Sequence, residues 1–175
     1  LGAGGAPELG DASRLPLRRE ITAMAGMPDG GGYYFLGKDG GVFAFGNAPF
    51  LGSVADVPLV ADAVAIAPTC TGRGYYIVAA DGGVFTFGDA VYHGSMTGVP
   101  LNAAIVSIVP RCTNGGYWIT GRDGGVFAFG DAGFFGSLGD APPVDEIAGM
   151  NATDDELGYW LIRTNGDVVP FGSAR

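Results

Sequence analysis

Short apolar runs of four to six residues recur along the chain and are separated by glycine-rich stretches. The runs at residues 33–36 and 42–45 flank an Asp39-Gly40 pair, which is typical of a β-hairpin with a two-residue type I′ turn. The first of these runs, "YYFL", is apolar on both faces, whereas a strand with one face in water would alternate. The pattern therefore predicts short antiparallel strands in sheets that are covered on both sides.

The hairpin sequence recurs with a period of 42 residues. Asp39, Asp81 and Asp123 are spaced by 42, and Asn165 continues the series. Each unit contains up to four candidate strands, which in the first complete unit read "ITAMAG", "GYYFLG", "GVFAFG" and "APFLGS". Four antiparallel strands in about 40–45 residues are typical of a β-propeller blade. The units cover residues 21–62, 63–104, 105–146 and 147–175 plus 1–20, and we expect a single domain over residues 1–175.

The two ends of the chain indicate how the units are arranged. Residues 4–21 align with residues 88–105, so the chain starts with a fourth strand and stops after a third. We therefore predict an all-β, four-bladed propeller with four-stranded blades, in which residues 4–12 complete the sheet of residues 147–172. Small residues such as Ala23 and Ala25 in the first strands suit the crowded axis of a ring. A linear solenoid, a fragment of a longer array and a strand-swapped dimer are the alternatives.

Composition and charge exclude several partners. The 33 glycines show no Gly-X-Y period, which excludes collagen. The net charge of −9 argues against nucleic acid and against anionic lipid, because both require clustered Lys and Arg. Residues 90–110 are long enough to span a membrane, but they contain polar residues, Gly and Pro and match a repeat unit, so we expect no membrane insertion. The opening "LGAGGAPELG" lacks the features of a secretory signal, which a mature secreted domain would also lack.

The motif "GYW…DGGVFAFGDA…GS" resembles tandem repeats of secreted actinobacterial proteins, which often lie beside cell-wall-active or hydrolytic domains. The resemblance covers nearly the whole chain. It implies an extracellular or cell-surface location, a propeller-like fold and a role in binding, and it brings no catalytic residues. The fourth copy departs from the motif at four positions, so we expect it to share the common role less fully. These positions are Asn165, Asp167, Val169 and Pro170.

Residues able to carry catalysis or hold a metal are few. His93 is the only histidine, which excludes a histidine-based zinc cage, and no Gly-x-Ser-x-Gly nucleophile motif occurs. We predict no enzyme activity, no cofactor and no metal. Cys70 and Cys112 occupy equivalent positions in neighbouring units. A disulfide needs Cα atoms within about 7 Å, which neighbouring blades provide only close to the axis, so a bridge and two separate thiols both remain open.

Repeated carboxylates and aromatic residues supply the candidate binding site. The recurrence of Asp39 in each unit is explained by its position in the hairpin turn. Asp89 and Asp131 are expected to bond nearby backbone amides. Two aromatic series recur, one at Tyr34 and one at Phe50, and each either packs between blades or offers flat faces to a sugar. The predicted ligand-binding residues are Tyr34, Tyr76, Trp118, Trp160, Tyr92, Asp89 and Asp131. The sequence thus favours a non-catalytic module that binds cell-surface or cell-wall carbohydrate at several sites; the alternative is a protein-interaction or scaffold module without glycan affinity.

Overall fold

The computed structural model describes residues 8–175 as an all-β protein, in agreement with the predicted fold class. These residues form twelve strands, and none of them forms a helix that could cross a membrane. The strands are β1 (Ile21–Gly26), β2 (Gly32–Gly37), β3 (Val42–Gly46), β4 (Ala63–Pro68), β5 (Gly74–Ala79), β6 (Val84–Gly88), β7 (Ile105–Pro110), β8 (Gly116–Gly121), β9 (Val126–Gly130), β10 (Ile147–Ala152), β11 (Gly158–Arg163) and β12 (Val168–Gly172).

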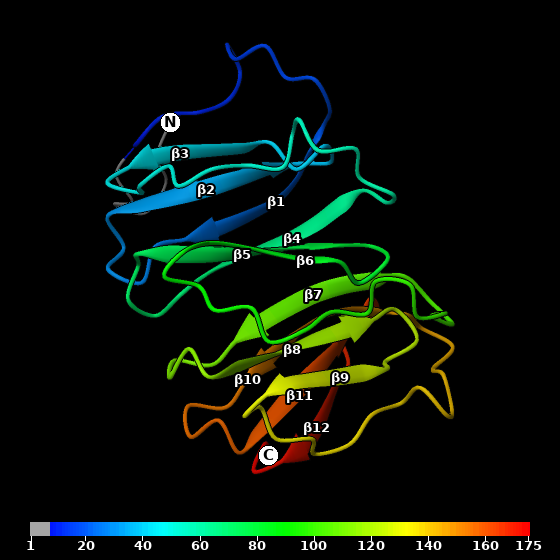
Figure 1. Ribbon diagram of the computed structural model, residues 1–175. Coiled ribbons are helices and arrows are strands. Elements are labelled where there is room, and N and C mark those ends of the chain that lie inside the picture. The colour runs from blue at the N-terminus through cyan, green and yellow to red at the C-terminus, as the bar shows by residue number, and fades with distance from the viewer. Residues whose placement is uncertain (1–7) are drawn as a thin grey trace.

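Each repeat unit folds into one three-stranded antiparallel sheet. We name them sheet 1 (β1–β3), sheet 2 (β4–β6), sheet 3 (β7–β9) and sheet 4 (β10–β12), and the middle strand of each is the second in sequence. The sheets follow one another along a stack, with sheet 1 at the top and sheet 4 at the bottom of Figure 1. Within sheet 1, Tyr34 pairs with Ala44 and Leu36 with Val42, and the other sheets repeat this register.

Neighbouring sheets approach each other most closely at their first strands. β1 contacts β4, β4 contacts β7 and β7 contacts β10. Within residues 8–175, no Cα atom of the third strands β3, β6 and β9 lies within 8 Å of a strand of the next sheet, so the sheet backbones diverge outward like a wedge and side chains such as Val42 fill the space between them. Small side chains such as Ala23, Ala25 and Ala65 lie on the crowded first strands, as the sequence predicts.

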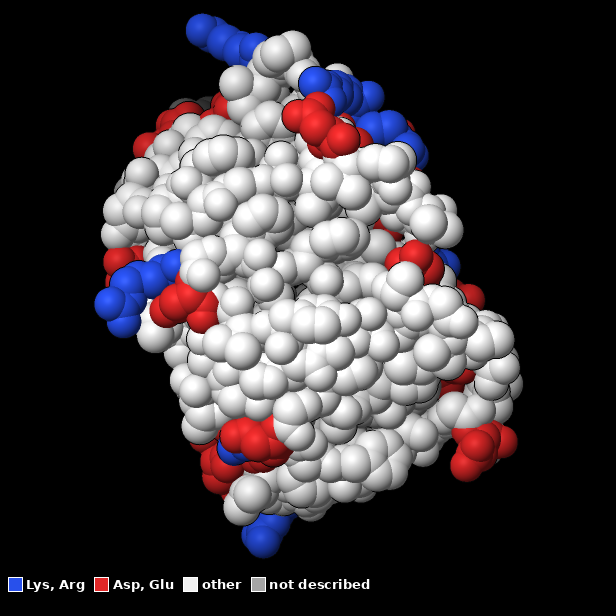
Figure 2. Space-filling model, viewed as in Figure 1, with Lys and Arg blue, Asp and Glu red and all other residues white. Residues whose placement is uncertain are grey.

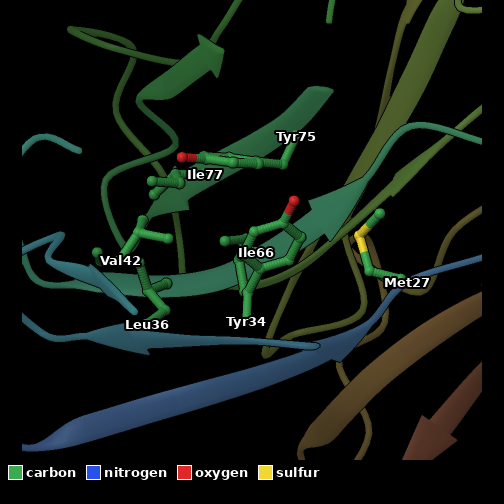
Figure 3. Close-up of a cluster of buried hydrophobic side chains, with 8 residues drawn as sticks. Met27, Tyr34, Leu36, Val42, Ile66, Tyr75 and Ile77 are labelled. Atoms are coloured by element: carbon green, nitrogen blue, oxygen red, sulfur yellow. The ribbon is translucent and has the colours of Figure 1, made fainter. Parts of the chain in front are cut away.

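Three hydrophobic clusters fill the three junctions between sheets. At the first junction, Tyr34, Leu36 and Val42 of sheet 1 face Tyr75 and Ile77 of sheet 2 (Figure 3). In sheets 2 and 3, one face of the middle strand thus packs forward on the next sheet, and the other face packs back on the preceding sheet. This arrangement explains why these strands are apolar on both faces.

The predicted fourth strand is wrong for the part of the chain that the structure describes, where each sheet has three hydrogen-bonded strands. The backbone of residues 48–54 bonds to sheet 1 at the two ends of the segment, where Ala48 N donates to Phe45 O (3.4 Å) and Val54 N donates to Gly40 O (3.2 Å). The segment instead fills the outer, widening part of the junction. We call residues 48–54, 90–96 and 132–138 the seam segments, because each runs along one junction.

The predicted ring closure is not confirmed: among the described residues, Gly10 packs on sheet 1 rather than on sheet 4. The Tyr33 hydroxyl donates to Gly10 O, and Gly10 lies against the ring of Phe45. Within residues 8–175, sheet 4 has three strands and β10 does not contact β1. Residues 4–7 of the predicted closing strand lie outside the described residues. The physical reason is that Gly10 repeats the position of Gly52, which packs forward on the next sheet in the same way.

The hairpin turn also differs from the predicted type I′ form. A type I′ turn requires a positive φ at both central residues, but in the first hairpin only Gly40 has one, at 80°. Gly40 N donates to Gly37 O (2.8 Å), which closes a three-residue loop with glycine in the left-handed position. The Asp39 carboxylate accepts the Gly41 N–H (3.1 Å), so its role within the turn is as predicted.

Candidate binding surface

Three of the predicted ligand-binding aromatic residues lie inside the junctions. Tyr34, Tyr76 and Trp118 are each 0% exposed. A ring without accessible surface cannot stack on a sugar, so these three residues serve packing, which was the alternative explanation of their recurrence. The fourth member of the series, Trp160, is partly exposed because it lies on the face of sheet 4 that no further sheet covers.

The polar tips of these buried rings hold the start of each seam segment. Tyr34 donates its hydroxyl to Pro49 O (3.1 Å), and the indole nitrogen of Trp118 donates to Gly133 O (2.7 Å). At the middle junction the Tyr76 hydroxyl accepts the Val91 N–H (3.2 Å). Burial raises the pKa of Tyr34 to about 12, so its hydroxyl keeps its proton at physiological pH.

A second tyrosine, from the following unit, bonds the fourth and fifth residues of each seam segment, which are Leu51 and Gly52 in the first. The Tyr75 hydroxyl accepts the Leu51 N–H (3.1 Å) and donates to Gly52 O (2.6 Å). Tyr117 and Tyr159 make the same pair of bonds at the other two junctions. We call Tyr75, Tyr117 and Tyr159 the seam tyrosines. Sequence reasoning missed their role, although the invariant tyrosine of the "GY" motif was the available signal.

The residue between these two anchor points is the exposed aromatic residue of the second series. Phe50 is 60% exposed, Tyr92 56% and Phe134 62%. We call these three residues the aromatic row. Their neighbours on both sides are fixed by buried side chains from two sheets, so each ring is presented on a constrained backbone. Of the seven predicted ligand-binding residues, Tyr92 is the one that the structure places in this row.

The glycine of each seam segment is required by its surroundings. Gly52 has a φ of 132°, and a Cβ atom there would lie 2.7 Å from the ring of Phe87. The Phe87 ring lies this close to Gly52 because it packs in the junction directly beneath the seam segment. The segment therefore lies flat against the next sheet, directly after the exposed ring of Phe50.

The predicted carboxylates make structural contacts at the inner turns. Asp89 accepts hydroxyl hydrogen bonds from Thr69 (2.9 Å) and Thr71 (2.6 Å), and the Thr71 bond is the main reason that the pKa of Asp89 lies below its usual value. Asp131 forms an ion pair with Arg111 (2.9 Å). Both carboxylates thus tie the end of a third strand to the turn between the first two strands, through side chains rather than the expected backbone amides.

Cys70 and Cys112 form a disulfide that links the inner turns of sheets 2 and 3. Their Cα atoms are 5.1 Å apart. This distance is short because the sheets converge at the first strands, where equivalent positions of neighbouring units come close. Of the two possibilities that the sequence left open, the structure shows the bridge. His93 lies near the same junction, and its Nε2 is 3.0 Å from Asn114 O.

No group of three or more His, Cys, Asp and Glu residues within the described part of the chain is placed to hold a metal ion. No protein-family model matches the chain, and no curated protein shows significant similarity to it. The fold and the surface define the class of molecule directly: a tandem-repeat, all-β protein that presents one constrained, exposed aromatic ring at each sheet junction.

Removing one seam hydroxyl should cost stability without exposing the core. Tyr117→Phe leaves the His93 N–H and the Gly94 carbonyl without this partner, so we expect the free energy of unfolding to fall by about 1–3 kcal/mol. Urea denaturation measures this. The control is Tyr92→Phe, whose hydroxyl bonds only Ser95 at the surface (3.2 Å) and should have little effect. Equal effects of the two changes would contradict the seam role.

Proposed function

We propose that this protein is a non-catalytic extracellular binding module that recognises cell-surface or cell-wall carbohydrate through the aromatic row. The observation that carries the proposal is the exposure of the same ring in three consecutive units, at Phe50, Tyr92 and Phe134. Exposed aromatic faces offer a large apolar area to the C–H face of a sugar. Rings held on a constrained backbone lose little conformational entropy on binding.

Repetition suits a polymeric ligand. The same exposed ring recurs once at each of the three junctions, so the row offers equivalent rings at successive steps along the stack. Each contact alone is weak, but several contacts on one chain of sugars add through their high effective concentration. A repeating polysaccharide therefore fits the row better than a single small molecule does.

The charge of the surface favours an uncharged ligand. Figure 2 shows a broad uncharged area across the middle of the face in view, with Asp, Glu, Lys and Arg at its margins. The chain has a net charge of −9, which repels polyanions at long range. We therefore expect neutral polysaccharides to be preferred to nucleic acid and to acidic glycans.

An extracellular location is supported by the disulfide between Cys70 and Cys112. Disulfides persist in oxidising compartments and are rare in the cytosol. The bond closes at the exposed inner turns, where a cytosolic reductant would reach it. This observation agrees with the location implied by the repeat motif.

The test replaces all three rings, as Phe50→Ala, Tyr92→Ala and Phe134→Ala together. We expect the fraction of protein retained on insoluble cell-wall polysaccharide to fall by roughly 10-fold or more, because the contacts act together. The control changes three exposed apolar residues outside the row, as Val60→Ala, Val99→Ala and Val144→Ala, and should be retained like the unmodified protein. Equal retention of both variants, or no retention of the unmodified protein, would contradict the proposal.

A protein-interaction module is the second candidate, and one observation favours it. Ile162 and Val168, on the uncovered face of sheet 4, are 38% and 52% exposed. Their equivalents Leu36 and Val42 are buried under the next sheet. Sedimentation velocity over a range of protein concentrations distinguishes the candidates. Self-association together with absence of polysaccharide retention would favour a scaffold, either stacked or strand-swapped, over the carbohydrate module.

A further inference from the structure

One position of the repeat differs at each of the three junctions. It is held by Gly72, Asn114 and Glu156, which are equivalent residues in the inner turns of sheets 2, 3 and 4. All three adopt the left-handed backbone conformation, with φ values of 68°, 60° and 54°. This position therefore keeps one backbone conformation at the three junctions, whereas its side chain differs.

At the junction of sheets 2 and 3, the Asn114 side chain bridges to the preceding unit. Its amide nitrogen donates to Asp89 O, and its amide oxygen accepts the hydroxyl of Tyr76. Tyr76 is one of the buried rings that hold the start of a seam segment. Asn114 thus occupies the space between two inner turns and the end of β6.

At the junction of sheets 3 and 4, Glu156 fills the same place. Its carboxylate accepts the Arg111 side-chain Nε–H (2.9 Å) and the Cys112 backbone N–H (2.6 Å). The Glu156 and Arg111 side chains are only 16% and 18% exposed. An ion pair therefore occupies this junction.

At the junction of sheets 1 and 2, Gly72 has no side chain to reach across, and an open pocket of about 480 Å³ lies there. This volume is in the range of small-molecule sites. The lining comes from the inner turns of both sheets and from the end of β3. The lining includes Met27, Asp29, Asn47, Pro49, Cys70 and Thr71.

The pocket wall carries hydrogen-bonding groups in fixed positions. Asp29 accepts the Gly31 N–H (2.9 Å) and the side-chain amide of Asn47 (2.7 Å), and the Gly31 bond is the main reason that its pKa lies below its usual value. The carboxylate therefore stays charged, with oxygen lone pairs left to accept further bonds. Cys70 is held in place by its disulfide to Cys112.

The apolar part of the wall is formed by Met27, Pro28 and Pro49. Met27 stands at the edge of the buried cluster in Figure 3, apart from the rings of Tyr34 and Tyr75. Pro49 directly precedes Phe50, so the pocket adjoins the first ring of the aromatic row. No Lys or Arg side chain lines this pocket.

We infer that this pocket binds one uncharged sugar residue, and that Gly72 is the residue that makes the site. The inference rests on the proposed carbohydrate function and adds to it a class of ligand. Sugar hydroxyls donate to Asp29 and exchange hydrogen bonds with the side-chain amide of Asn47. The C–H face of the ring packs on Met27 and Pro49. A sugar carboxylate would face Asp29 without a cation to offset the repulsion, so acidic sugars are disfavoured.

The experiment uses Gly72→Asn, which copies the residue that fills the next junction. Asparagine tolerates the left-handed conformation better than most residues, and Asn114 shows that this turn accepts it. A Cβ atom at residue 72 would lie 3.0 Å from Met27 Cε, the mobile end of a flexible side chain. The matched control is Gly30→Asn, the equivalent position in sheet 1, where φ is 71° and a Cβ atom would have no neighbour within 4 Å.

Isotope-labelled protein is titrated with glucose, mannose, galactose and N-acetylglucosamine, and separately with glucuronate, while amide NMR shifts are followed. We expect a neutral sugar to shift the amides of Asn47, Thr71 and Gly72 in the unmodified protein and in Gly30→Asn. Gly72→Asn should weaken this binding at least 10-fold. Binding of glucuronate as strong as that of the neutral sugars, or unchanged binding by a folded Gly72→Asn variant, would overturn the inference.

The two proposals fail in different ways. If polysaccharide is retained through the aromatic row but no neutral sugar shifts the pocket amides, only the pocket inference fails. If a neutral sugar binds the pocket but the triple alanine variant of the row is retained like the unmodified protein, the role of the row fails and the pocket stands. A well-dispersed amide spectrum for each variant confirms that it is folded.

Discussion

Replacing Trp118 with alanine is expected to lower the free energy of unfolding by about 3–5 kcal/mol. The side chain is 0% exposed and belongs to the cluster between sheets 3 and 4. Its ring lies 6.0 Å from that of Tyr159, centroid to centroid, and its nitrogen donates to Gly133 O at 2.7 Å. The substitution therefore leaves a cavity and releases the start of the seam segment. Chemical denaturation followed by far-ultraviolet circular dichroism measures the loss.

The control for this prediction is Phe134→Ala in the same unit. Phe134 is also a large aromatic residue, but it is 62% exposed, so its loss should change stability by only about 0.5 kcal/mol. A similar loss of stability in the two variants would contradict the assignment of Trp118 to the core and of Phe134 to the surface. The two variants thus distinguish a buried packing role from an exposed surface position within a single repeat unit.

Removing the disulfide is expected to cost about 3–4 kcal/mol of stability. Cys70 and Cys112 are separated by 42 residues in sequence, so their bond restricts a long loop of the unfolded chain. The variant Cys70→Ser with Cys112→Ser should unfold at a lower denaturant concentration than the unmodified protein. Dithiothreitol should lower the stability of the unmodified protein by a similar amount, since it breaks the same bond.

The response of the double serine variant to dithiothreitol is the control, because that variant has no disulfide to lose and should not change. Both cysteine residues lie at exposed turns, so the exchange of sulfur for oxygen has little packing cost of its own. If the double variant and the unmodified protein unfold at the same denaturant concentration, the bridge does not stabilise the stack.

The period of the sequence predicted the strands well because it reports a repeated local environment. The position of the turn at Asp39 and the apolar run of β2 both follow from local rules. The fourth strand could not be judged in this way. Residues 48–54 have strand-like composition, but the outward-widening gap between sheets places them in the junction, and that gap is a property of the assembled stack.

The prediction of ring closure was not confirmed for a related reason. Residues 4–21 match residues 88–105, which include the last part of a repeat unit. In a ring, such a segment would complete the last sheet. In the observed stack, Gly10 lies on Phe45 of sheet 1, as Gly52 lies on Phe87 of sheet 2. The same sequence match is therefore expected from a ring and from an open stack, and only the contacts separate them.

The candidate site was predicted in part. Both aromatic series recur every 42 residues, so their period cannot show which of them is buried. The structure separates them: Tyr34 turns into a junction, whereas Phe50 lies outside it. The pocket at Gly72 was not predicted, because its presence depends on what Asn114 and Glu156 do in other junctions. Comparing equivalent residues across units identifies such a site once the junctions are known.

The way in which each seam segment is held sets the number of rings that the protein can present. A ring such as Phe50 stands between an anchor from its own unit, Tyr34, and an anchor from the following unit, Tyr75. One unit in isolation would supply only half of this support. The number of rings that the protein can hold is therefore equal to the number of pairs of adjacent units. Two units joined in sequence are the smallest piece able to hold one ring in its native position.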